Sequence, residues 1–189
     1  MLDTIAGQVN AGERRMFKEL TVENWSQPDP VMRHFGLVEG GRPRQAMADD
    51  WARAFLKLEL SPAVPQNVRD LFEVARGVCL YGWFFYPLYQ IGEDQLFRVV
   101  DSAVASKCKR DGGPKARASF ADRIKWLCDH GVIPEEERLR WDGLRNLRNI
   151  TSHPEMQMIH PPGSVLTSFQ LAARLISALF EQMTVREAT

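Results

Sequence analysis

Apolar residues recur every three or four positions along most of this chain, which is the spacing of one face of an α-helix. From Gln45 onward the spacing predicts a helix that ends before Pro62. A longer apolar stretch begins at Gln66 and runs to about Arg110. Because it is apolar on most sides, it predicts a central, buried helix, and Pro87 should kink or interrupt that helix by removing a backbone donor.

Three further helices are predicted in the second half of the chain. Ser119, with Asp122 three residues on, resembles a capping box at a helix start, and Gly131 marks the end of that helix. The next helix is expected to begin at Pro134, because three glutamates follow it and acids stabilise a helix N-terminus. It should stop near Ser152, since the residue before a proline avoids helical geometry.

The last predicted helix follows the loop 161–163 and carries an apolar face through about residue 180. No convincing strand pattern and no internal repeat is found. We therefore predict an all-α fold, a single-domain helical bundle of about five main helices with an irregular N-terminal arm. Residues 1–42 form the loop-rich arm, packed on the main body, and residues 43–189 form the bundle.

Length and composition fit one globular domain. The chain has 189 residues, 44% of them hydrophobic, with 24 basic and 24 acidic side chains and no net charge. This composition excludes wholesale disorder and argues against a protein that coats nucleic acid by bulk attraction. A local basic surface around a site remains compatible with it.

The chain carries no sequence signal for export or membrane insertion. It lacks a run of about 20 apolar residues, and its first residues do not form a signal peptide, so we expect no membrane association. Three widely spaced cysteines make an odd set, which argues against a disulfide framework. We therefore expect a cytoplasmic protein.

The densest chemical signal lies near the end of the helix expected over residues 134–152. Two Arg-Asn pairs stand there one helical turn apart. Spacings of three and four place Arg145, Arg148, Asn149 and Ser152 on one polar face. His153 follows at the helix C-terminus, where the helix dipole favours a charged imidazolium.

Arg148 and His153 are five residues apart and would point about 140° away from each other in an ideal helix. A break before Pro154 can bring the histidine back toward the arginine. A site shared between two chains would also remove the constraint.

The segment Arg148-Asn149-Ile150-Thr151-Ser152-His153 resembles the Arg-x(4–6)-His signature of the HEPN superfamily, whose members are helical bundles. Asn149 stands where that family usually has a polar residue. The aromatic stretch 80–96 is similar to the kinked aromatic helix pair of some bacterial members. The resemblance extends over about residues 66–182.

This resemblance implies a metal-independent endoribonuclease that needs no cofactor and is often a homodimer with facing motifs. It implies that Arg148 holds the scissile phosphate, that His153 serves in acid/base chemistry, and that Asn149 positions one or the other. RNA and a second copy of the chain are the expected partners. An antitoxin or regulatory protein is a further expected partner, because many such proteins are toxins or phage-defence effectors. Arg145, Ser152 and Glu93 are further candidates for substrate binding.

Elementary chemistry agrees with these roles. A guanidinium offers a planar fork of donors to phosphate oxygens. Histidine titrates near neutrality and can move a proton to or from a ribose hydroxyl or a leaving group. Because RNA supplies its own nucleophile, the 2′-hydroxyl, the protein needs neither a metal nor a nucleophilic side chain.

Glu93 and Asp94 follow the expected interruption at Pro87. A carboxylate there can orient Arg148 or His153, as an acidic residue in this region does in some relatives. The alternative is an exposed pair at a helix start.

Other interpretations of these features stay open. The Arg148–His153 segment also fits an ordinary polar helix end, a non-catalytic module that binds a nucleotide, RNA or a protein, or a pure interaction domain. The basic loop 107–117 can follow an RNA backbone or form a solvated, mobile loop. The aromatic residues 84–89 favour a core over a base-stacking platform.

Several classes of site lack their signatures. Cys128 and His130 are local, but with His153 they do not form a zinc set of recognisable spacing. The sequence also contains no hydrolase Gly-x-Ser-x-Gly elbow, no phosphate-binding Gly-x(4)-Gly-Lys loop and no Gly-x-Gly-x-x-Gly fingerprint.

Overall fold

A computed structural model of the chain describes residues 17–115, 117–151 and 160–181, with the backbone alone for 146–151. The described residues form six α-helices, one short 3-10 helix and one two-stranded hairpin, which confirms the all-α class. The elements in chain order are η1 (Pro30–His34), β1 (Gly36–Glu39), β2 (Arg42–Gln45), α1 (Ala48–Leu56), α2 (Gln66–Tyr81), α3 (Leu88–Arg110), α4 (Phe120–Asp129), α5 (Glu135–Thr151) and α6 (Pro162–Glu181).

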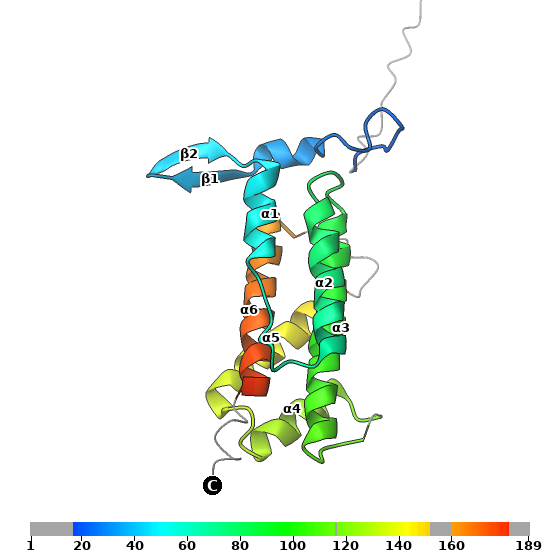
Figure 1. Cartoon of the computed structure of the whole chain (residues 1–189), viewed down its shortest axis with the longest axis vertical. Helices are drawn as coiled ribbons and strands as arrows, with labels where there is room; N and C mark the ends of the chain where they lie inside the picture. The colour runs from blue at the N-terminus through cyan, green and yellow to red at the C-terminus, as the bar shows by residue number, and fades with distance from the viewer. Residues whose placement is uncertain (1–16, 116, 152–159, 182–189) are drawn as a thin grey trace, which may run out of the picture.

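The long helices α2, α3 and α6 stand side by side along the long axis, and α1 extends the α6 side toward the hairpin (Figure 1). Helices α4 and α5 pack across the other end, where both contact α3. A single core runs through the bundle and takes large side chains from all six helices: Phe55, Phe72, Leu96, Leu127, Trp141 and Phe169.

The local signals in the sequence set most helix boundaries. The long apolar stretch divides as expected, with α2 ending at Tyr81 and α3 beginning directly after Pro87. Ser119 caps α4 by accepting a hydrogen bond from the Asp122 backbone, and Asp122 returns the contact to the Ser119 backbone. Helix α5 begins with the three glutamates, as acids at a helix N-terminus predict.

The expectation of no strand is wrong for residues 36–45. Strands β1 and β2 pair antiparallel with Leu37 opposite Arg44, and β2 crosses the expected boundary between residues 42 and 43. The turn consists of Gly40 and Gly41, whose φ angles are 56° and 79°. Positive φ at both central residues is what a tight hairpin turn requires, so the glycine pair joins two strands here.

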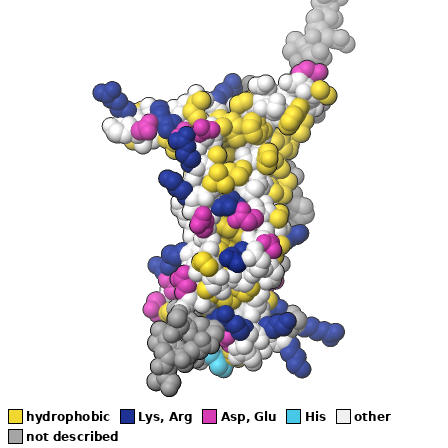
Figure 2. All heavy atoms as spheres, in the orientation of Figure 1, with side chains coloured by type: hydrophobic (Ala, Val, Ile, Leu, Met, Phe, Trp, Pro, Cys, Tyr) yellow, Lys and Arg dark blue, Asp and Glu magenta, His cyan; other side chains and the backbone are white. Residues whose placement is uncertain are grey.

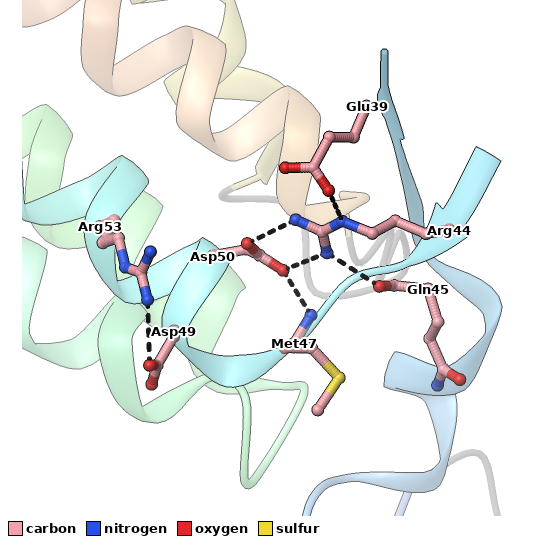
Figure 3. A network of polar contacts seen from close by, with 7 residues as sticks. All are labelled: Glu39, Arg44, Gln45, Met47, Asp49, Asp50 and Arg53. Atoms are coloured by element: carbon pink, nitrogen blue, oxygen red, sulfur yellow. Dashed lines mark hydrogen bonds and ion pairs between the residues drawn. The ribbon is translucent and has the colours of Figure 1, made fainter. Parts of the chain in front are cut away.

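The hairpin is tied to α1 by a charged network (Figure 3). Arg44 donates to both oxygens of Asp50 at 2.6 and 2.9 Å and to Glu39 at 2.7 Å. Asp50 also accepts from the Met47 backbone at 2.8 Å, which closes the first turn of α1. Arg44 therefore links the hairpin residue Glu39 to Asp50 in the first turn of α1 by specific contacts.

Helices α2 and α3 approach each other very closely. A methyl group added at Gly92 would lie 2.3 Å from the Cys79 sulfur and 3.2 Å from the Ala75 carbonyl oxygen, so no larger residue fits there without a shift.

Of the residues that the structure describes, α6 alone is long and apolar enough to cross a membrane by length and hydropathy. Half of that window is packed inside the bundle, as in the core helix of a folded domain.

Candidate functional site

The most unusual polar feature of the core is the carboxylate of Glu93, in the second turn of α3. Glu93 is completely buried. One carboxylate oxygen, Oε1, accepts a hydrogen bond from the Ser168 hydroxyl at 2.7 Å. The other, Oε2, lies 2.6 Å from Nδ1 of His160.

These three residues come from three parts of the fold. Glu93 belongs to α3, Ser168 to the second turn of α6, and His160 to the segment that leads into α6 through Pro161. An ionised carboxylate is an acceptor only, so both contacts are satisfied when Ser168 and His160 donate. With Glu93 ionised, the proton of the His160 ring that faces the carboxylate is therefore on Nδ1.

The histidine is held by its backbone as well as by its ring. The Tyr86 hydroxyl donates to the His160 carbonyl at 3.3 Å. Tyr86 is itself fixed, because its backbone amide donates to buried Asp29 at 2.9 Å and its ring stacks on Phe35 at 5.8 Å. Through these contacts the N-terminal arm supports the position of His160.

The surroundings of Glu93 are apolar and keep nearby groups neutral. Burial, and then the neighbouring Glu93 charge, raise the pKa of the Cys79 thiol far above its ordinary value. Burial likewise raises the pKa of the Tyr89 hydroxyl, which has no hydrogen-bond partner among the described residues. Neither group is suited to act as a nucleophile or base at neutral pH.

The sequence interpretation of the acidic pair is half right. Asp94 is exposed and accepts from Gln90 at 3.2 Å, as the surface alternative expects. Glu93 is not a surface residue, because it lies in helical register with the buried residues Tyr89, Leu96 and Phe97. Its described partner is His160, whereas the sequence suggested Arg148 or His153.

The other sequence candidates lie at or beyond the end of α5. Arg148 and Asn149 belong to its last turn, where the structure describes the backbone only. Ser152 and His153 lie outside the described residues. The helix expected to carry this motif is therefore present, and the contacts of its side chains stay a prediction.

Arg145 lies in a hollow between α3 and α5, lined also by Phe97, Val100 and Asp101. Its Nε atom is buried without a hydrogen-bond partner among the described residues, and its terminal nitrogen is 3.7 Å from Asp142. The α3 residues beside it are four to eight positions beyond Glu93, or about 6–12 Å along the helix.

The basic loop is partly helical, which changes its charge distribution. Helix α3 continues to Arg110, and Lys107 is buried 3.2 Å from Asp111. Exposed cations remain at Lys109, Arg110, Lys115 and Arg117. Of these, Lys109 and Lys115 line a hollow with buried Arg123. Lysine and arginine side chains project where α3 ends and α4 begins (Figure 2).

The aromatic residues expected in the core are buried there in part. Tyr86 and Tyr89 are buried in the core, as expected. His130 stacks on Trp126 and directs Nδ1 to the Trp126 carbonyl at 2.8 Å. Among the described residues no group of three or more metal-ligating side chains occurs, and the three cysteines are free thiols.

Sequence reasoning missed His160 and Ser168. No local pattern links them to Glu93, which precedes them by 67 and 75 residues. One signal was available: Glu93 stands on the apolar face of its helix, where an unpaired charge is costly and a partner is therefore expected.

No protein-family model, no curated protein and no solved structure matches this chain.

Proposed function

We propose that the protein is a metal-independent endoribonuclease of the HEPN type. The observation that carries the proposal is the contact between the His160 imidazole and the buried Glu93 carboxylate, which lie 2.6 Å apart. His160 follows the Arg148–His153 motif by seven residues in the sequence. A histidine fixed in this way is the kind of group that moves protons in phosphodiester cleavage. The helical bundle and the basic motif on its fifth helix are further support.

In this proposal Arg148 binds the scissile phosphate, and His153 moves a proton. Asn149 orients the phosphate or the histidine, and Arg145 and Ser152 contact the RNA nearby. The 2′-hydroxyl attacks the adjacent phosphorus, and the bond to the 5′-oxygen breaks. The products are a 2′,3′-cyclic phosphate and a free 5′-hydroxyl, so no metal-activated water is needed.

The test is cleavage of a mixed RNA pool by purified protein in EDTA. Arg148→Ala and His153→Ala should each lower the rate at least about 100-fold, the range expected for a phosphate clamp or an acid/base group. Arg53→Ala and His34→Ala are matched controls, because both side chains are exposed on other elements, and they should retain the wild-type rate. Full activity of His153→Ala would contradict its role.

The biological role that accompanies the proposal is that of a cytoplasmic toxin or phage-defence effector, acting as a homodimer and held in check by an antitoxin or regulatory protein. Induced expression of the wild-type chain should then arrest growth, whereas Arg148→Ala should not. Sedimentation should give twice the mass of one chain. Unimpaired growth with active enzyme in the cell would contradict the toxin role.

A second candidate is a non-catalytic module that binds RNA or a nucleotide. The hollow lined by Lys109, Lys115 and Arg123 favours it, because cations grouped around a concavity suit phosphate groups. Its mark is RNA binding without turnover by the wild-type protein. Cleavage that depends on Arg148 would exclude it as the whole function.

A further inference from the structure

Among the described residues, the buried carboxylate of Glu93 has no arginine or lysine as a partner. Its two oxygens face a hydroxyl at 2.7 Å and an imidazole at 2.6 Å. Burying a carboxylate costs free energy that an apolar residue at the same place would avoid. A group retained at such a cost is a candidate for a role other than packing.

The geometry leaves one nitrogen of His160 available for chemistry. Nδ1 is engaged by Glu93, and Nε2 has no hydrogen-bond partner among the described residues. The side chain is 16% exposed, whereas that of Glu93 is 1% exposed. The imidazole therefore bridges the buried carboxylate and the surface, with the lone pair of Nε2 on the unpaired side.

We propose that His160 is the general base of RNA cleavage and that Glu93 is its positioning residue. This inference rests on the proposed endoribonuclease function and deepens it. Nε2 of His160 accepts the proton of the 2′-hydroxyl as the 2′-oxygen bonds to phosphorus. His153 gives its proton to the 5′-oxygen as the phosphorus–oxygen bond breaks, so one proton is taken up and one is released in each cleavage.

Glu93 serves this step in two ways. Its hydrogen bond fixes the tautomer in which Nε2 carries the lone pair, and its negative charge stabilises the imidazolium that forms. The Ser168 hydroxyl donates a hydrogen bond to the second carboxylate oxygen, which keeps the carboxylate from rotating away from His160. Ser168 is not a nucleophile here, because its hydroxyl is buried and donates to Glu93 and has no contact with the histidine among the described residues.

The experiment compares two RNA oligonucleotides that differ in one atom. The first is a sequence that the wild-type protein cleaves, and the second carries sulfur in place of the bridging 5′-oxygen at the scissile bond. A thiolate leaves without being protonated, so the modified substrate needs a base but no acid. His160→Asn should lower kcat at least about 100-fold on both substrates, whereas His153→Ala should do so only on the oxygen substrate.

Glu93→Gln tests the positioning role, because it keeps the size of the side chain and removes the charge. We expect kcat to fall about 10-fold or more on both substrates with KM unchanged, which a purely structural residue would not produce. Asp94→Asn and His34→Ala are the matched controls and should keep the wild-type kcat. Circular dichroism and thermal unfolding of each variant show whether its fold persists.

The possible outcomes separate the two proposals. If His160→Asn is folded and cleaves RNA at the wild-type rate, the inference is overturned and the ribonuclease proposal stands. If His160→Asn recovers on the sulfur substrate, His160 is the acid, and its role as base is overturned. If Glu93→Gln keeps the wild-type kcat, its positioning role is overturned. Absence of cleavage of any RNA by the wild-type protein overturns the ribonuclease function itself, and this inference with it.

Discussion

Helix α3 carries two buried charges, one near each end. Glu93 is 0% exposed and Lys107 is 2% exposed. They lie 14 residues apart (107 − 93), or about 21 Å along the helix. By burial alone the two residues look alike, and the difference between them lies in what each charge contacts.

The charge of Lys107 is paired with a residue four positions away in the sequence. Its ammonium lies 3.2 Å from Asp111, four residues on, and 6.0 Å from the centre of the Phe180 ring. A lysine in the last turn also interacts favourably with the negative end of the helix dipole. These contacts complete the C-terminus of α3 and stabilise the fold.

Among the described residues, the partners of Glu93 are distant from it in the sequence. Its partners His160 and Ser168 meet it because α6 packs on α3. One partner is an imidazole that reaches the surface, so the buried charge is linked to a group able to exchange protons with a ligand. The kind of partner therefore distinguishes a buried charge that stabilises the fold from one that indicates a candidate site.

The largest expected effect comes from removing each buried charge in turn. Glu93→Ala leaves the Ser168 hydroxyl and the His160 ring without their acceptor and should cost about 3 kcal/mol of unfolding free energy. Lys107→Met keeps the apolar stem of the side chain and leaves Asp111 half-buried, where water can reach it. We therefore expect a loss of about 1 kcal/mol of unfolding free energy. Urea unfolding measures both. Equal losses would remove the distinction between the two ends of α3.

The position of Glu93 depends on the close packing of α3 against α2. Gly92→Ala should cost about 2 kcal/mol, because its new methyl group would overlap the Cys79 sulfur. Gly77→Ala is the matched control, since nothing lies within 4 Å of a methyl group there, and it should stabilise α2 by about 0.5–1 kcal/mol.

Urea unfolding of the two glycine variants measures the difference. Cys79→Ala combined with Gly92→Ala should recover part of the loss, because it removes the overlapping sulfur. A Gly92→Ala variant as stable as the wild type would show that the contact relaxes easily.

A smaller effect is expected at the Lys107 end of α3, where Lys109 and Lys115 are exposed. If this hollow contacts RNA phosphates, Lys109→Ala and Lys115→Ala should each weaken binding and lower the slope of log affinity against log salt by about one. Lys57→Ala at the end of α1 is the control. Binding titrations with an uncleaved RNA at several salt concentrations give the slopes, and unchanged slopes would argue against contact.

The smallest expected effect concerns the hairpin contact of Asp50, which is local, like that of Lys107. Hydrogen bonds from Arg44 and the Met47 backbone hold the pKa of Asp50 far below its ordinary value of 3.8. A lowered folded-state pKa contributes stability above the unfolded-state pKa, and this contribution is lost as pH falls below about 4. Asp50→Asn should therefore show a smaller loss of stability between pH 6 and pH 3 than the wild type.

Urea unfolding at the two pH values checks this, because the other carboxylates contribute equally to both proteins. Asp49→Asn is the control, since Asp49 is exposed and pairs with Arg53 in its own helix. Identical pH dependence of the wild type and Asp50→Asn would show that the hairpin contact adds no stability.

The sequence by itself determined the helices, because their signals act within one or two turns. Apolar spacing, the Ser119 cap and Pro87 gave the bundle and most of its boundaries. It also gave the basic motif on α5, as residue types in order along a helix. The hairpin was missed because a two-glycine turn between short, mostly exposed strands leaves no apolar alternation to detect.

The tertiary structure alone decided the partner of Glu93. The position of Glu93 on an apolar helix face predicts that it has a partner. It does not indicate which histidine of the chain that partner is. The choice follows from how α6 packs against α3 and from the arm, which holds Tyr86 where its hydroxyl donates to the His160 carbonyl. Such contacts join residues 67 and 75 positions apart, and no local preference of the chain specifies them, because only the packing of the whole core brings these groups within hydrogen-bonding distance.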